Sequence, residues 1–108
     1  MSKNSAHGGI TLDIRGRAVT TTEAARELAR LHSGMVTVWY TDTDGDRHHV
    51  TVYARSTAYG SVTPPQVHWS GPLPVPAADA RAFAAAVTAA ADLADQADKL
   101  PVGEAAPA

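Results

Sequence analysis

Three aspartates at alternate positions, Asp42, Asp44 and Asp46, are the first group in the sequence that suggests metal binding. Carboxylates at this spacing occur in EF-hand calcium loops, which need glycine at the sixth position and glutamate at the twelfth. Counted from Asp42, those positions hold Arg47 and Tyr53. The acidic run is therefore more typical of a solvated turn between two strands than of a calcium site.

Histidines are the next candidates for chemistry. His48 and His49 are neighbours in a stretch that favours a strand, so their side chains point to opposite faces and cannot bind one ion together. His49 and His68 can share a face, but two imidazoles without a nearby carboxylate make a poor zinc site. His32 falls beside leucines in a helical pattern, which favours a partly buried, hydrogen-bonded ring over a catalytic base. We expect no metal and no cofactor.

The usual patterns of nucleophilic catalysis and phosphate binding are missing. The chain has no cysteine, and no serine is framed by the glycines of a nucleophile elbow. Gly8, Gly9 and Gly16 do not stand between a strand and a helix at the spacing of a phosphate-binding loop. We therefore name no catalytic residue and favour a non-catalytic role. A small enzyme with its site between the sheet and the C-terminal helix is an alternative.

Aromatic and basic side chains of one hairpin face form the best candidate for a binding surface. The residues that we assign to partner binding are Trp39, Arg47, His49, Tyr53 and Arg55. Aromatic residues and arginine are enriched among the anchors of protein interfaces, although aromatic pairs also stabilise exposed sheets. A nucleic-acid-binding module that uses this face is the other alternative. The nine Lys/Arg against eleven Asp/Glu make it unlikely, because nucleic-acid binders need a clustered basic face.

These candidate residues belong to a predicted β-hairpin over residues 35–55. Two runs of β-branched and aromatic residues, 36–40 and 49–53, flank an Asp-Gly turn sequence. A two-residue turn would mix valines with polar residues on both faces of the hairpin. A three-residue loop, with Gly45 in the left-handed position of a G1 bulge, shifts the register by one residue.

The shifted register separates apolar from polar side chains. It places Val38 opposite Val50 on one face, and Trp39 and His49 on the other. A one-residue slip would move every side chain to the wrong face, so burial of the valines selects this register. We expect the valine face to form the core and the tryptophan face to meet solvent.

The chain before the hairpin predicts a strand and a helix. Residues 10–15 alternate strictly, as in a half-buried strand. Thr20 and Glu23 have the spacing of a capping box, and the helix should run to about His32 and end at a left-handed Gly34. Its charged side should collect Glu23, Arg26, Glu27 and Arg30, with Ala24, Ala25, Leu28, Leu31 and His32 on the other side.

After the hairpin, residues 55–63 lose alternation and predict an irregular segment. Residues 66–70 predict a short strand with Val67 and Trp69 pointing inward, and a final helix should cover residues 77–99 after Pro76. The fold class is α+β, a small antiparallel sheet in β-α-β-β-β-α order with two helices packed on one face. We expect a single domain over residues 10–100, with a disordered lead-in at 1–9 and a disordered tail at 101–108.

The helix–three-strand–helix part of this order resembles that of double-stranded-RNA-binding domains. In that family the second helix starts with lysines that grip phosphates. The corresponding stretch here, residues 76–81, carries Arg81 as its only basic residue. The resemblance is therefore one of element order and does not imply RNA binding.

The apolar stripe of the C-terminal helix predicts a homodimer. The helix would extend about 35 Å at 1.5 Å per residue, whereas the hairpin strands span about 20 Å at 3.3 Å per residue. We therefore expect part of the stripe to remain uncovered and to meet a twofold-related copy. The residues assigned to this dimer interface are Ala90, Leu93, Ala94 and Ala97.

Length and composition set the remaining expectations. With 108 residues, a net charge of −2 and no cysteine, the chain fits one domain in a reducing compartment. No apolar run reaches the length of a membrane span, and residues 1–9 lack the apolar core of a signal peptide. We expect a cytoplasmic protein-interaction module that self-associates and has no membrane partner.

Overall fold

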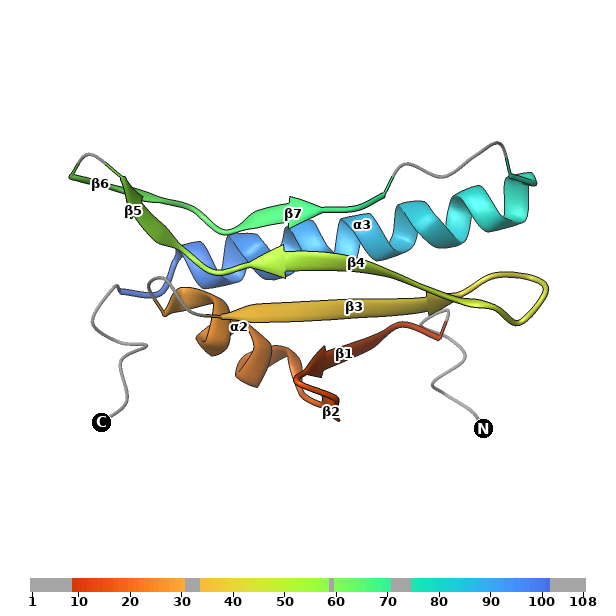
Figure 1. The fold of residues 1–108 in the computed structure, drawn as a ribbon, viewed down its shortest axis with the longest axis horizontal. Helices are drawn as coiled ribbons and strands as arrows, with labels where there is room; N and C mark the ends of the chain where they lie inside the picture. The colour runs from red at the N-terminus through yellow and green to blue at the C-terminus, as the bar shows by residue number, and fades with distance from the viewer. Residues whose placement is uncertain (1–8, 31–33, 59, 71–74, 102–108) are drawn as a thin grey trace.

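The computed structural model describes residues 9–30, 34–58, 60–70 and 75–101. It has a five-stranded antiparallel sheet in the order β2-β1-β3-β4-β7, a separate β5-β6 hairpin and two helices (Figure 1). The elements are β1 (Thr11–Ile14), β2 (Arg17–Ala18), α2 (Thr21–Ala29), β3 (Met35–Thr41), β4 (Arg47–Tyr53), β5 (Ser56–Ala58), β6 (Ser61–Thr63), β7 (Gln66–His68) and α3 (Ala77–Asp98). The predicted α+β class is confirmed.

The β3-β4 hairpin has the predicted register. Val38 pairs with Val50 and both are buried, while Trp39 pairs with His49 on the opposite face. Gly45 has a φ of +90°, and its N–H donates to the carbonyl of Asp42 over 3.0 Å. The left-handed glycine thus closes the three-residue loop that brings the valines together.

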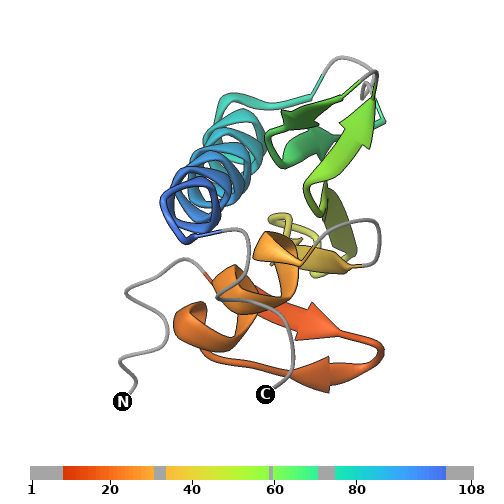
Figure 2. The same cartoon turned by 90° about the vertical axis from the view of Figure 1, so that its left-hand side faces the viewer.

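Both helices lie on the valine side of the sheet (Figure 2). α2 packs on β1 and β3, α3 packs on β3, β4 and β7, and the two helices contact each other. The largest fully buried side chains are Leu28, Leu93, Val36, Val38, Val50 and Val52. One core between the sheet and the two helices therefore holds the domain together, and neither of the described helices covers the other face of the sheet.

The capping box of α2 is confirmed, but the predicted end of this helix is wrong. The Thr20 hydroxyl accepts from the Glu23 N–H over 3.1 Å, and the Glu23 carboxylate accepts from the Thr20 N–H over 3.0 Å. The helix ends at Ala29, because Arg30 has extended backbone angles of −74° and 139°. Leu31, His32 and Ser33 lie outside the described residues.

Gly34 also differs from its prediction as a left-handed helix cap. It is not among the glycines with positive φ, and its backbone instead lies against the last turn of α2. A Cβ at this position would be only 2.4 Å from the carbonyl oxygen of Glu27. Glycine is needed here for a close approach of two backbones rather than for a special backbone angle.

Glu27 is buried, contrary to its assignment to the charged side of α2. Its exposed fraction is 9 %, and the backbone of Gly34, just before β3, lies against the Glu27 carbonyl. The Glu27 carboxylate lies 3.5 Å from the guanidinium of Arg30, which partly offsets the cost of burying the charge.

Two short hairpins were not predicted. Arg15 and Gly16, with φ of 53° and 84°, form the turn between β1 and β2, and the Asp13 carboxylate accepts from the Gly16 N–H. Within residues 55–63, predicted to be irregular, Ser56–Ala58 and Ser61–Thr63 pair as β5 and β6, and Gly60 has a φ of 83°. Strands of two or three residues are too short to show the alternation by which strands are recognised.

The final helix is confirmed over Ala77–Asp98, but the premise for a dimer through its apolar stripe is wrong. Leu93 is 2 % exposed, and the other residues assigned to that interface, Ala90, Ala94 and Ala97, are buried as well within the single chain. α2 and the sheet cover the stripe that was expected to remain bare. A second copy has no access to these side chains in the folded chain.

Candidate interaction surface

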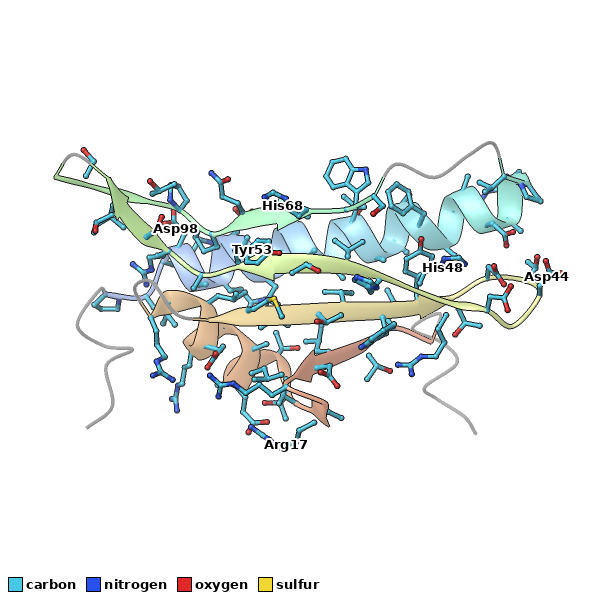
Figure 3. The ribbon with its side chains drawn as sticks, viewed as in Figure 1. Arg17, Asp44, His48, Tyr53, His68 and Asp98 are labelled. Carbon is cyan, nitrogen blue, oxygen red and sulfur yellow. The ribbon has the colours of Figure 1, made fainter. Side chains whose placement is uncertain are left out.

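The face of the sheet opposite α2 and α3 gathers four of the five side chains assigned to partner binding. We call this surface the outer face and define it by Trp39 of β3, Arg47, His49 and Tyr53 of β4, and His68 of β7. Strand pairing brings these residues together, because alternate positions of adjacent strands share one side of a sheet. Figure 3 shows Tyr53 and His68 beside each other on their two strands.

Arg47 and His49 both contact the indole ring of Trp39. The Arg47 guanidinium carbon lies 4.2 Å from the ring centroid of Trp39, and the His49 ring centroid lies 5.1 Å from it at an angle of 57°. A guanidinium over an indole is held by cation–π attraction and loses little of its capacity to donate hydrogen bonds. Within the described residues, Arg47 is exposed and forms no ion pair with a carboxylate.

A shallow pocket of about 220 Å³ adjoins this stack. Its walls include His49, Tyr53, His68 and Trp69. Tyr53 is 44 % exposed, and its ring meets the edge of His68 with 5.0 Å between centroids. Ligand sites for drug-sized molecules are typically about 300–1,000 Å³, so this pocket suits a single side chain better than a cofactor.

Trp69 was predicted to point inward and is in fact 51 % exposed. It follows the last residue of β7, and its ring packs against Phe83 of α3 at an interplanar angle of 67°, with 6.1 Å between centroids. The chain ends its pairing before Trp69, so the indole lies at the rim of the sheet, between the core and the outer-face pocket. No pattern of residues around Trp69 indicates this rim position.

Met35 is a further outer-face residue that the sequence interpretation missed. It pairs with Tyr53 and is exposed. The confirmed register already implied its place, because Met35 and Tyr53 fall opposite each other when Val38 faces Val50. Met35 extends the apolar part of the outer face toward the start of β3.

Arg55 was assigned to the same surface, and this assignment is wrong. Arg55 is 3 % exposed, and its guanidinium donates to the carbonyl oxygens of Ala97, over 2.8 Å, and Leu100 at the end of α3. β4 ends at Tyr53, and the Arg55 N–H then bonds to the Leu28 carbonyl on the helix side. The alternation of the strand no longer applies to a residue that has left the sheet.

The acidic loop at the tip of the hairpin has its own hydrogen-bond network. The Asp42 carboxylate accepts from the N–H groups of Asp44 and Asp46, both over 2.9 Å, and lies 2.8 Å from Nε2 of His48. Carboxylate oxygens of the three aspartates lie within 4.8 Å of one another. Both oxygens of Asp42 are engaged by protein donors, as expected for a carboxylate that closes a turn.

The hairpin tip is also tied to α3, which fixes it on the helix side of the molecule. The Thr43 N–H donates to the Asp79 carboxylate of the first turn of α3 over 2.8 Å. Tyr40, which stacks on His48, is buried between these acids, and its burial together with Asp42 and Asp79 raises the pKa of its phenol. The acidic cluster therefore faces the helix side, away from Arg47.

The hydrogen bond with His48 holds the pKa of Asp42 below its usual value, and the N–H groups of Asp46 and Asp44 act in the same direction. The Thr20 N–H likewise lowers the pKa of Glu23 in the capping box. A carboxyl group whose pKa is lowered by folding stabilises the fold above its unfolded-state pKa, and this contribution is lost as the pH falls through the folded value.

We expect the Asp42 contribution to decline as the pH falls below about 4, the range of an unperturbed aspartate, and to be lost once the pH is below the lowered pKa of the folded state. Asp42→Asn keeps an acceptor oxygen for the two N–H groups but removes the charge that His48 stabilises. Its melting temperature should therefore fall less between pH 5 and pH 2 than that of the wild type. Asp44→Asn is the control, because no hydrogen bond to the Asp44 side chain is found in the described residues. Equal acid sensitivity of Asp42→Asn and the wild type would contradict the prediction.

Comparison with known proteins gives no match to this chain among protein-family models, curated proteins or solved structures. None of the described helices has both the length and the apolar character needed to cross a bilayer. The outer face is therefore interpreted from its own chemistry.

Proposed function

We propose that this protein is a small, non-catalytic interaction module that binds another protein through its outer face. The observation that carries this proposal is the exposed Arg47 guanidinium on Trp39, which has no acidic partner among the described residues. Aromatic residues and arginine dominate the energetic centres of protein interfaces, and an arginine held in place on a ring loses little entropy on binding.

Nucleic-acid binding through the same surface has weaker support. A single-strand binder needs a positively charged groove and free aromatic faces on which bases stack. Trp39 already has Arg47 over one face of its ring and His49 beside it. Arg47 is the only Lys/Arg residue within β3, β4 and β7. The outer face therefore suits a protein partner better than a phosphate backbone.

The test is site-specific photo-crosslinking in the cells that naturally make the protein. A benzophenone amino acid replaces Thr51 on the outer face, and in a matched variant it replaces Thr88 on the exposed side of α3. We expect a discrete adduct from position 51 only, and its loss in Trp39→Ala, with circular dichroism unchanged. Equal labelling from both positions, or unfolding of Trp39→Ala, would contradict the proposed surface.

Two expectations from the sequence remain part of this proposal, namely a cytoplasmic location and self-association. The route through Ala90, Leu93, Ala94 and Ala97 is not retained, because these side chains are buried in the single chain. In the crosslinking experiment, an adduct of twice the mass of the chain would reveal self-association at whichever position forms it. Its absence at both positions would contradict self-association through either surface.

A further inference from the structure

We propose that the outer face recognises an extended acidic peptide segment of its partner, a proposal that rests on the function proposed above. In this arrangement Arg47 binds a carboxylate of the peptide, and the adjoining pocket takes a second side chain. The proposed function states only that a protein binds at the outer face. The present proposal adds that the bound segment is extended and acidic.

The Arg47 guanidinium is already oriented for binding a carboxylate and has no acidic partner among the described residues. It lies 4.2 Å from the ring centroid of Trp39 and forms no ion pair within the part of the chain that the structure describes. A planar guanidinium presents paired N–H groups that match the two oxygens of a carboxylate. Because Trp39 already orients it, binding a carboxylate requires little further ordering of the side chain.

The strands around Arg47 carry no acidic residue. The sequences of β3, β4 and β7 contain no aspartate or glutamate, while His49 and His68 lie on the same face as Arg47. Asp13 of β1 lies on the same side of the sheet beside Thr37, and its carboxylate accepts from the Gly16 N–H. A negatively charged partner therefore meets the positive charge of Arg47 and no carboxylate from β3, β4 or β7.

The distance between Arg47 and the pocket suits an extended peptide segment. Thr51, at the pocket wall, is four residues after Arg47 on β4. At about 3.3 Å per residue this separation is roughly 13 Å, and an extended peptide covers it in four residues. Positions four apart in an extended chain point to the same side. The partner segment should thus carry an acidic residue and a bulky residue four positions apart.

A second copy of this chain is a poorer occupant of the outer face. α3 lies on the opposite side of the sheet from the outer face (Figure 2), and it carries the exposed acids Asp92, Asp95 and Asp98. Contact between these two opposite surfaces would be head-to-tail and would build open chains of molecules rather than a closed dimer. An acidic segment of another protein meets the same charge requirement without this consequence.

The test is a titration of the ¹⁵N-labelled full chain with capped nonapeptides, followed by NMR. The probe peptide is built of Gly and Ser with one Glu and, four residues later, one Leu; a matched peptide carries Lys in place of Glu. We expect shifts of the Trp39 indole N–H and of β4 amides for the Glu peptide. The Lys peptide should bind at least tenfold more weakly. Arg47→Gln should weaken binding of the Glu peptide about tenfold or more, while Arg81→Gln, an exposed arginine of α3, should not change it.

Several outcomes would overturn the acidic-peptide proposal. These are equal binding of the Glu and Lys peptides, no shifts at millimolar Glu peptide, or tighter binding of a ten-residue oligothymidylate with a steep salt dependence. Shifts that appear on concentrating the protein alone would assign the face to a second copy. If the crosslink from position 51 forms with another protein but the peptides fail, the proposed function stands and only the acidic partner is wrong.

Discussion

Replacing Leu93 by alanine is expected to lower the free energy of unfolding by about 2–5 kcal/mol, the usual cost of deleting a fully buried leucine side chain. Leu93 is 2 % exposed and belongs to the core that α3 forms with α2 and the sheet. The loss combines the burial of its apolar atoms with the cavity that remains. Urea denaturation followed by circular dichroism measures the change.

The matched control is Thr88→Ala on the exposed side of the same helix, which should change stability by no more than about 0.5 kcal/mol. Sedimentation of the wild type and of Leu93→Ala separates the core role from the dimer role expected from the sequence. If Leu93→Ala kept its stability and changed only the sedimenting mass, Leu93 would be an interface residue and its burial in the chain would not describe the protein in solution.

The hairpin shows why part of this fold was predictable from sequence. Its strands are seven residues long, so the alternation of valines with polar residues extends over several pairs and one register alone buries them all. The position of Gly45 agrees with that register. The capping box of α2 was predictable for a similar reason, since Thr20 and Glu23 carry out their two hydrogen bonds within one turn.

Features that depend on long-range packing were not predictable. Glu27 and Arg30 follow the exposed face of an isolated helix, but Glu27 is buried where the Gly34 backbone lies against the last turn of α2. The β2 strand requires Arg15 to adopt a left-handed backbone, which a residue other than glycine rarely does. The apolar stripe of α3 is covered by α2, a contact between residues about 65 positions apart that no local pattern encodes.

The candidate site also contains residues that were predictable from a regular strand pattern and features that were not. Trp39, Arg47, His49 and Tyr53 were placed together because each belongs to a regular strand whose register was known. Arg55 was placed with them by extending the alternation two residues beyond the end of β4, where it no longer holds. The pocket beside His49 depends on how β7 ends, and strand pairing alone could not reveal it.

Replacing Arg55 by methionine is expected to lower the free energy of unfolding by about 2 kcal/mol. The guanidinium donates to the carbonyls of Ala97 and Leu100, and hydrogen bonds to a charged group contribute about 1.5–3 kcal/mol each. A cation at the end of a helix is further stabilised by the helix dipole. Burying the charge of Arg55 costs free energy, and its Nε has no hydrogen-bond partner in the described residues. This cost reduces the net loss of stability expected on replacing Arg55.

Arg26→Met on the exposed side of α2 is the matched control, because arginine and methionine have similar helix propensities there. Hydrogen exchange gives a second readout: Arg55→Met should accelerate exchange at the last turn of α3, near Lys99 and Leu100, more than in β3. If Arg55→Met kept its stability but lost the crosslink to the partner, Arg55 would be a partner-binding residue, as the sequence analysis predicted. The expected result is lower stability of Arg55→Met, with crosslinking intact at a temperature at which the variant is folded. It would establish that Arg55 anchors the end of α3 to the segment after β4.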